Sequence, residues 1–359
     1  MRIIGEFGRE DVAKVYVAAM RDGGNHVVEF VESLQPPIPR EKKWVLIVSS
    51  SFGCPMDCLM CDAGGRYQGK LETGEILAQV DHMVLGRYPE GTVPSEKFKI
   101  QFARMGEPSL NPNVLEALCA IANRYDAPGL MACVSTIAPE GSGKFFERLA
   151  AIKRSQYAGG KFQLQFSIHT TDDEKRDWLL PGRKWGLERI ASFGDGFHDE
   201  GDRRITLNFA LTRGLPVDPD VIARHFDPEK FAVKLTPLNP TAKAIRNGLA
   251  SALDPFEPSA GVKLAKAFGD LGFETILSIG ELEENRIGSN CGQFVSMMDG
   301  QSLRMDGRYE TAKYRLAWPE TGSPAPGGPS STPSRPVSSE APAGNGSRRA
   351  SSRPRAGPP

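Results

Sequence analysis

Short segments with alternating apolar and polar residues are interleaved along the chain with longer segments of helical period. The first kind predicts strands at 44–50, 99–104, 130–136, 162–168, 204–211 and 231–237, and a further strand at 273–279. The second kind predicts helices near 73–86, 112–124, 143–155, 184–193, 217–225 and 258–270. Strands that alternate with helices pair in parallel through right-handed crossovers, so the pattern predicts an α/β protein.

The number of repeating units favours one architecture within this class. Six strand–helix units suit a partial (β/α)6 barrel better than a closed barrel of eight units. Before the repeat, two β-rich segments flank the turn sequence "DGGN" at 22–25, which predicts a β-hairpin. We therefore expect a small N-terminal β-hairpin extension at 1–40 and the barrel at 41–300.

The composition changes sharply near the end of the sequence. From Pro319 onward the residues are almost all Pro, Gly, Ser, Ala and Arg. Such a segment buries too little apolar surface to offset its ordering entropy, so 319–359 is predicted to be a disordered tail after a C-terminal extension at 301–318. The chain has 44 basic and 44 acidic residues, and the tail holds five Arg and two Glu, which leaves the remainder at about −3. This mildly acidic remainder weakens the expectation of a nucleic-acid partner.

The cellular compartment is predicted from three features that we do not find in the sequence: a secretory signal, a membrane span and a disulfide framework. The first residues carry acidic side chains where a secretory signal needs a basic and then an apolar segment, and no apolar run approaches the ~20 residues of a membrane span. Six cysteines in 359 residues are too few for a disulfide framework. We expect a cytoplasmic protein without a membrane partner.

Three of the cysteines are closely spaced. Cys54, Cys58 and Cys61 form a C-x3-C-x2-C pattern after the first strand of the repeat, at the carboxyl end where barrel chemistry lies. Three thiolates without a nearby fourth suit a [4Fe–4S] cluster that keeps one iron open for a ligand. A zinc ion completed by a distant ligand, or a loop of thiols without metal, are the alternatives.

Together with this loop, five further motifs occur in a fixed order. The pattern of cysteines resembles the radical S-adenosylmethionine superfamily. The whole set resembles more narrowly the class A methyltransferases, which methylate adenine carbons of ribosomal RNA and include the phenicol-resistance enzymes. The motifs run between Val12 and Phe294 and read "VSSSFGCPMDCLMC", "ARMGEPSLN", "CVSTIAP", "QFSIHTTDDEKRD", "KLTPLNP" and "GSNCGQF".

The resemblance implies a [4Fe–4S] cluster, S-adenosyl-L-methionine as cofactor and a reductant such as flavodoxin or ferredoxin. It places Gly106 and Glu107 at the methionine amino group, where a carboxylate facing an ammonium is physically sensible. It places four strand-end residues at the adenosyl and carboxylate parts of the cofactor: Ser135, Ser167, His169 and Asn239. Read without the family, His169 is a hydrogen-bonded core histidine and the turn at Gly106 is an ordinary capped turn.

Cys291 has the most informative role in this resemblance. In the family the corresponding cysteine is S-methylated, and its methylene carbon is then added to the aromatic acceptor. Glu29 matches a glutamate proposed as a proton acceptor, although by itself it reads as a surface carboxylate.

Two departures from the family pattern concern product release and RNA binding. The family's product-releasing cysteine lies seven residues before the first cluster cysteine, and Ile47 occupies that position here. Cys133 lies two residues before Ser135 and so shares its strand face, either as a substitute thiol or as a buried core residue. An RNA-contacting helical domain precedes the hairpin in the family, whereas the printed sequence begins close to its hairpin.

The sequence therefore predicts a radical methyltransferase acting on an sp2 carbon of an RNA adenine or a related acceptor. A radical enzyme adapted to a small molecule or peptide is the first alternative, and a non-catalytic RNA-binding relative is the second. Intact "MGEP", "SIH" and "LNP" motifs disfavour the second alternative.

Overall fold

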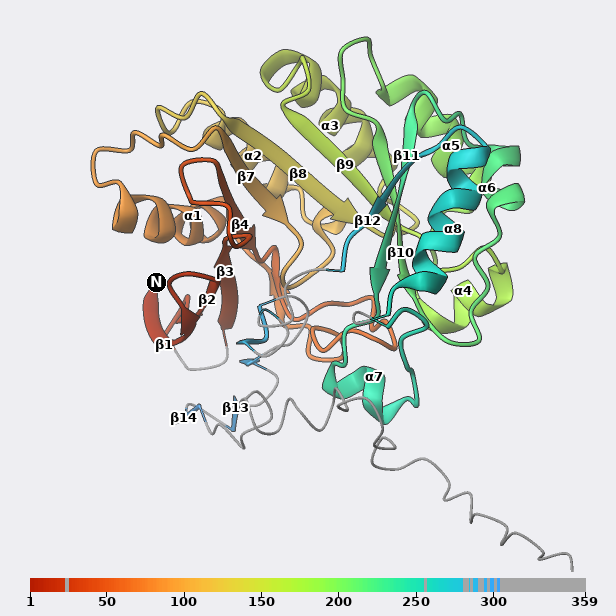
Figure 1. Cartoon of the computed structure of the whole chain (residues 1–359). Helices are drawn as coiled ribbons and strands as arrows, with labels where there is room; N and C mark the ends of the chain where they lie inside the picture. The colour runs from red at the N-terminus through yellow and green to blue at the C-terminus, as the bar shows by residue number, and fades with distance from the viewer. Residues whose placement is uncertain are drawn as a thin grey trace, which may run out of the picture.

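A ten-stranded sheet runs through the molecule, with the strand order β1-β2-β3-β4-β7-β8-β9-β10-β11-β12 (Figure 1). The computed structural model describes residues 1–22, 26–254 and 257–279, together with 284, 287–289, 294, 295, 298, 299, 302 and 303. The strands are β1 (Arg2–Arg9), β2 (Ala13–Ala19), β3 (Val27–Ser33), β4 (Lys43–Val48), β7 (Lys97–Phe102), β8 (Leu130–Thr136), β9 (Phe162–Ser167), β10 (Ile205–Leu211), β11 (Phe231–Pro237) and β12 (Glu274–Leu277).

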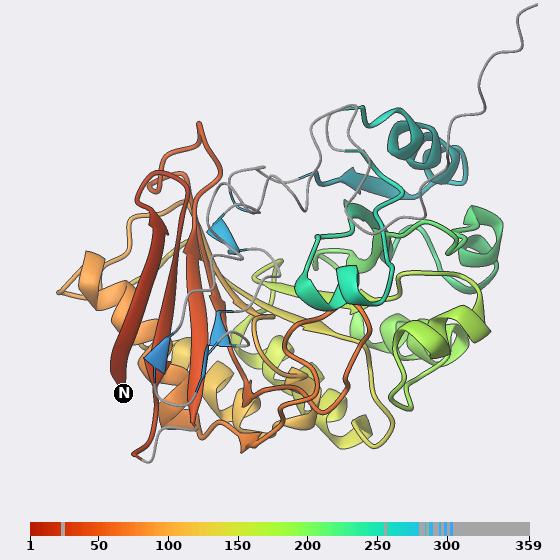
Figure 2. The same ribbon diagram turned by 90° about the horizontal axis from the view of Figure 1, so that it is seen from below.

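The strands from β4 to β12 are parallel, whereas β1 to β4 pair antiparallel. The crossover helices lie around one side of the sheet (Figures 1 and 2) and are α1 (Thr73–Arg87), α2 (Asn113–Ile121), α3 (Gly143–Gln156), α5 (Leu187–Phe197), α6 (Pro219–His225) and α8 (Ser259–Asp270). Shorter elements are η1 (Pro108–Leu110), α4 (Asp173–Leu179), α7 (Ala242–Arg246), β5 (Ser51–Phe52), β6 (Gly69–Lys70), β13 (Met298–Asp299) and β14 (Ser302–Leu303).

The predicted α/β class, with its parallel strands and crossover helices, is confirmed. The predicted hairpin is confirmed as β2 and β3, and β3 pairs with β4, so the hairpin belongs to the main sheet. Strand β1 and helices α4 and α7 were not predicted. The tail at 319–359 lies outside the described residues. In the part of the chain that the structure describes, no helix is long and apolar enough to cross a membrane.

The two faces of the parallel sheet differ in polarity. On the face toward the helices, large apolar side chains such as Trp44, Phe98 and Phe166 are fully buried in the main core. The opposite face, called here the inner face, alternates with it along each strand. Its partly exposed side chains include Lys97, Lys99, Gln101, Ser135, Gln163, Gln165, Ser167, Asn208, Lys234 and Thr236.

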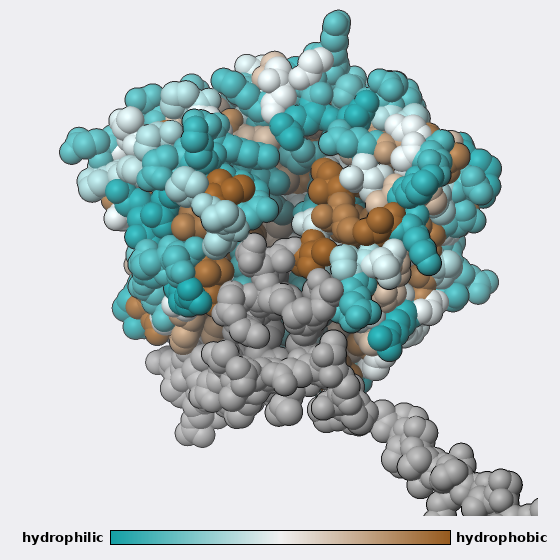
Figure 3. Space-filling view, in the orientation of Figure 1, coloured by the Kyte–Doolittle hydropathy of each residue, from teal (hydrophilic) through white to brown (hydrophobic). Residues whose placement is uncertain are grey.

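Parallel sheets normally bury apolar side chains on both faces. A polar inner face is therefore the surface on which ligands of this fold are expected to lie. The space-filling view is hollowed near its centre, on the side of the sheet away from the helices (Figure 3).

Candidate active site

The cysteine loop begins directly after β5 at the carboxyl end of the parallel strands. Strands β5 and β6 pair antiparallel and close its two ends, and a bridge joins Cys54 to Gly64. Gly53 has a φ of +71°, and a Cβ atom there would lie 2.2 Å from the Arg66 carbonyl oxygen. The tight path therefore requires glycine at this position.

Gly53→Ala is expected to destabilise the fold by about 1–3 kcal/mol, because it adds a side chain in a left-handed conformation and against backbone. Gly74→Ala is the matched control. Gly74 is an exposed residue of α1, and a Cβ atom there would meet nothing within 4 Å. That change should be neutral or slightly stabilising. Denaturant unfolding of both variants measures the difference, and equal stabilities would contradict the account of the loop.

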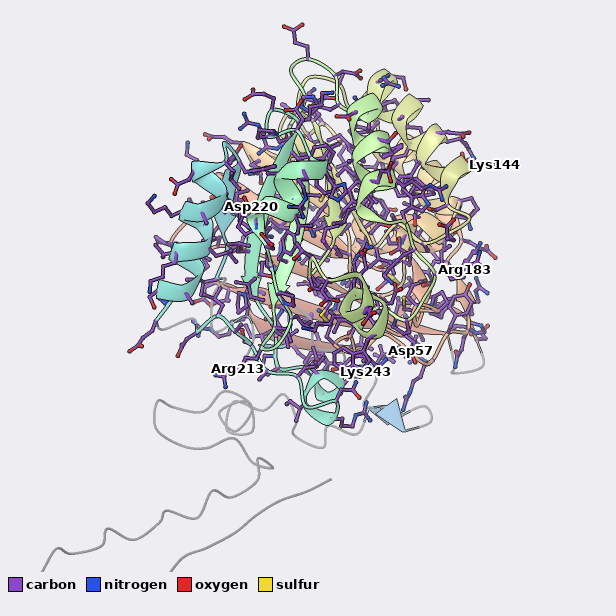
Figure 4. All side chains as sticks on the ribbon, turned by 90° about the vertical axis from the view of Figure 1, so that its right-hand side faces the viewer. Asp57, Lys144, Arg183, Arg213, Asp220 and Lys243 are labelled. Carbon is purple, nitrogen blue, oxygen red and sulfur yellow. The ribbon has the colours of Figure 1, made fainter. Side chains whose placement is uncertain are left out.

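Helix α7 holds the cysteine loop from below (Figure 4). Asp62 accepts hydrogen bonds from the backbone N–H groups of Ala242 (3.2 Å) and Lys243 (2.8 Å). Lys243 Nζ donates to the Asp57 carbonyl oxygen at 3.0 Å and forms an ion pair with the Asp57 carboxylate. Thr241 Oγ1 donates to the Met60 carbonyl oxygen at 2.8 Å. The loop is thus fixed by residues distant in sequence.

The three thiols lie in a partly buried, largely apolar environment. Cys54 and Cys58 pack against a small cluster formed by Met56, Ile137, Leu179 and Leu180. Burial, with the Cys61 thiol as the next cause, raises the pKa of Cys58 to about 12 and places the pKa of Cys54 well above its usual range. A bound cation would reverse this, since it stabilises the thiolate.

The arrangement of the donors bears on which metal group fits. Within the described residues, no three His, Cys, Asp or Glu side chains are set to hold one ion. A single zinc ion needs every ligand within about 2.0–2.3 Å of one point, whereas an iron–sulfur cluster binds each thiolate through a different iron. The loop supplies three thiolate donors, which are the ligands of iron–sulfur clusters, and in a [4Fe–4S] cluster each would bind a different iron.

The turn after β7 lies against the start of the cysteine loop. The Met105 carbonyl oxygen accepts a hydrogen bond from the Ser50 N–H group at 2.7 Å. Gly106 has a φ of +100°, and a Cβ atom there would lie 2.0 Å from Ser51 Oγ. Glycine is required for this close approach of the two segments.

Glu107 is buried beside the thiols. Its Oε1 atom accepts from the Ser109 N–H (3.0 Å) and the Thr136 hydroxyl (2.6 Å), and its Oε2 atom accepts from the Ile137 N–H (3.0 Å). Burial raises the pKa of this carboxyl despite these donors. Ile137, which donates to Glu107, also belongs to the apolar cluster against which Cys54 and Cys58 pack, so the carboxyl and these thiols share a neighbour.

The other predicted cofactor residues lie at the same edge of the sheet. Ser135 is near the end of β8, and its Oγ accepts from the side-chain amides of Gln101 (3.3 Å) and Gln165 (3.2 Å). Ser167 ends β9, and Asn239 follows β11 by two residues. The structure therefore brings these residues to one edge of the sheet.

His169 is buried and has an unusual backbone. Its φ is +69°, which a residue with a Cβ rarely adopts. Its Nδ1 atom accepts from the Ala210 N–H at 3.1 Å, and burial, followed by the charge of Arg176, lowers its pKa to about 3. The imidazole is thus neutral with its proton on Nε2. Strained residues cluster at functional sites, which supports a role beyond packing.

Glu29 is fully buried, so the interpretation of it as a surface carboxylate is wrong. Its Oε1 atom lies 3.2 Å from Arg104 Nη2, and its Oε2 atom accepts from the Phe294 N–H at 2.8 Å. Arg104 donates to the carbonyl oxygens of Gly288 (2.8 Å) and Ser289 (2.9 Å). Arg104 was not among the predicted site residues, although a charged residue two positions after a strand with a buried face is a usable signal.

Ile47 lies in an apolar cluster. It packs against the buried cluster that contains Val31 and Phe294, as Ile287 and Val295 also do. Phe294 stacks on Phe7 with ring centroids 4.3 Å apart. Cys291 itself lies outside the described residues.

The strand face of Cys133 is confirmed. It pairs in register with Gln101 and Gln163 and so shares the inner face with them, where it is almost completely buried.

Some curated proteins are similar in sequence to this chain. The chain is 33% identical over 208 residues to a probable dual-specificity RNA methyltransferase RlmN of Saccharopolyspora erythraea, covering 54% of each chain. It is 29% identical over 262 residues to the protein of the same name from Streptomyces griseus, covering 70% of this chain and 67% of that protein. The chain therefore spans about half to two thirds of the length of these curated relatives. No family model matches the chain.

A solved structure extends the comparison to the fold. A radical SAM methyltransferase from Sphaerobacter thermophilus superposes with a TM-score of 0.62 at 22% identity, over 81% of this chain and 80% of that one. The chain shares the fold of that protein.

Proposed function

We propose that the protein is a radical S-adenosylmethionine methyltransferase that modifies an sp2 carbon of an RNA adenine or a related acceptor. The observation that carries the proposal is the position of the buried Glu107 next to Ile137, which packs with Cys54 and Cys58 of the three-thiol loop. Relatives named as RNA methyltransferases align with more than half of the chain. The same proposal includes a partial barrel and a division of the chain into domains at residues 40, 300 and 318. It also includes a cytoplasmic location and a flavodoxin-like or ferredoxin-like reductant.

Cys54, Cys58 and Cys61 would hold a [4Fe–4S] cluster, which with S-adenosylmethionine supplies a 5′-deoxyadenosyl radical. Glu107 would accept a hydrogen bond from the methionine ammonium, and the turn at Gly106 would let the cofactor approach the backbone. Each carboxylate oxygen accepts more than one hydrogen bond, so Oε2 retains capacity beside its bond to Ile137. Ser135, Ser167, His169 and Asn239 would contact the remainder of the cofactor.

Cys291 would carry the methyl group to the acceptor. Glu29 remains the candidate proton acceptor, and its contact with the Phe294 N–H lies three residues from Cys291. Its ion pair with Arg104 supports a second role in holding the flanks of that segment.

The packing of Ile47 favours a second candidate, a radical enzyme for a smaller acceptor that needs no product-releasing thiol at this position. An apolar side chain there contributes to the cluster around Phe294 and offers no nucleophile. Cys133 is the thiol on the same face, separated from Ile47 by the intervening strand β7.

Anaerobic reconstitution with methyl-deuterated S-adenosylmethionine tests the two candidates. We expect mass spectrometry to find the label on the Cys291 peptide, and Cys291→Ala to form 5′-deoxyadenosine without methylated product. An unlabelled Cys291 peptide, with normal turnover by Cys291→Ala, would favour hydrogen abstraction from a different acceptor.

A further inference from the structure

The central parallel strands contain several lysines but no aspartate or glutamate. The six adjacent strands β4, β7, β8, β9, β10 and β11 contain Lys43, Lys97, Lys99 and Lys234, and none of them contains an Asp or a Glu. This one-sided charge is notable in a chain whose basic and acidic residues are equal in number. The strands therefore concentrate positive charge near the inner face.

Three of these lysines are direct neighbours. Lys43 and Lys97 are register partners on β4 and β7, and Lys99 is the next residue of β7 on the same face. Like charges directly opposite one another destabilise a sheet. Burial, and then the neighbouring cations, lower the pKa values of Lys43 and Lys97, with Arg203 among the groups acting on Lys97.

The described residues offer little compensation for this charge. Lys43 donates to the neutral amide oxygen of Gln35, and Glu284 acts on it from a distance. No ion pair is found for Lys97 or Lys99 within the part of the chain that the structure describes. Lys153 provides a contrast, because this buried lysine forms ion pairs with both Asp199 and Asp202.

We propose that Lys43, Lys97 and Lys99 form an anion site on the inner face that binds a phosphate group of the acceptor. A phosphate group has several oxygens and up to two charges, so it can accept from all three ammonium groups at once. This inference rests on the proposed function, because it assigns the acceptor a phosphate while the carboxyl end of the sheet holds the reacting part.

The position along the strand fits a nucleotide. Lys99 precedes the last residue of β7 by three positions, or roughly 10 Å at the rise of a β-strand. An acceptor held by its phosphate at the lysines can therefore extend along the inner face toward Gln101 and Ser135. A nucleotide unit has this extended shape, whether it is free or part of a single-stranded RNA.

Thermal unfolding in inorganic phosphate tests the anion site without any cofactor. Increasing phosphate, at constant ionic strength set with chloride, should raise the Tm of the wild-type protein, because a ligand of the folded state stabilises it. Lys97→Gln/Lys99→Gln should not respond, and its starting Tm should be equal or higher because the repulsion is removed. Lys144→Gln, a change at an exposed residue of α3 (Figure 4), should respond like wild type. Equal responses in all three proteins would overturn the proposal.

Binding of nucleotides distinguishes the sources of the phosphate. Fluorescence anisotropy with a labelled, short, adenine-containing single-stranded RNA, and competition by adenosine 5′-monophosphate, would be measured for the same proteins. The double variant should bind at least about tenfold more weakly, as expected for losing charge-assisted hydrogen bonds. Competition by the mononucleotide alone would indicate a free nucleotide as the acceptor, and tight RNA binding would indicate a polymer. Unchanged affinity in the double variant would overturn the site.

Formation of 5′-deoxyadenosine by the reconstituted enzyme separates this proposal from the proposed function. The double variant should retain that activity, since its changes lie on the strands and away from the cysteine loop. Loss of phosphate binding with retained 5′-deoxyadenosine supports the anion site. A wild-type enzyme that binds phosphate but forms no 5′-deoxyadenosine would contradict the proposed function alone.

Discussion

Replacement of Cys54, Cys58 or Cys61 by Ala, one at a time, is expected to abolish cluster binding and 5′-deoxyadenosine formation. The wild-type protein purified without oxygen should contain about four iron and four sulfide per chain. In the proposed site each thiol would be a separate ligand. The loop is closed by the β5–β6 pair and fixed by α7, so we expect none of the described side chains to move in and replace a thiol. Iron and sulfide analysis together with the visible spectrum measures the loss.

Cys119→Ala provides the control for these variants. Cys119 is a partly buried cysteine of α2, outside the loop, and its removal should leave the iron content unchanged. Full retention of iron in any loop variant would contradict the assignment of that cysteine as a ligand.

Arg104→Met is expected to destabilise the folded protein by about 3–5 kcal/mol at neutral pH, because it leaves the buried Glu29 carboxylate without its countercharge. It also removes the donors to the Gly288 and Ser289 carbonyl oxygens. The double variant Arg104→Met/Glu29→Gln should recover part of this loss, since neither residue of the pair then carries a charge. Denaturant unfolding measures both, and equal stability of the single and double variants would contradict the pairing.

The same pair predicts a dependence on pH. Burial raises the pKa of Glu29 from 4.5 to about 6 in the folded protein. As the pH rises from about 4.5 to 6, the unfolded chain releases this proton before the folded protein does, so the contribution of Glu29 to stability falls across this range. The penalty in Arg104→Met should accordingly shrink in acid, where Glu29 is protonated.

Local patterns were sufficient to predict most of the fold. Strand β8 occupies the predicted residues 130–136, and the ends of α1 and α3 differ from the prediction by one residue. Helix α7 has only five residues, too few to display a helical period. Strand β1 is interrupted by Gly5 and Gly8, which weakened its alternating pattern.

The site was predictable where the chemistry is contiguous in sequence. The cysteine loop and the Gly106–Glu107 turn each lie within a few residues, and the structure brings them together at the expected edge. The contact between Glu29 and Arg104 joins residues 75 positions apart. It depends on the antiparallel part of the sheet, of which the β2–β3 hairpin was predicted and β1 was not. A side chain's countercharge depends on such tertiary neighbours, so sequence alone left Glu29 as a surface group.

The hydrogen bonds between the region of α7 and the cysteine loop have a consequence for biosynthesis. Neighbouring strands of the sheet are also neighbours in the sequence, so each unit can dock on the one before it as the nascent chain lengthens. The hydrogen bonds between the loop and the region of α7 instead join residues 180–188 positions apart, from Asp62–Ala242 to Leu59–Asn247. Most of the protein must therefore be synthesised before α7 can fix the loop, and in the proposed enzyme the cluster would be inserted late in maturation.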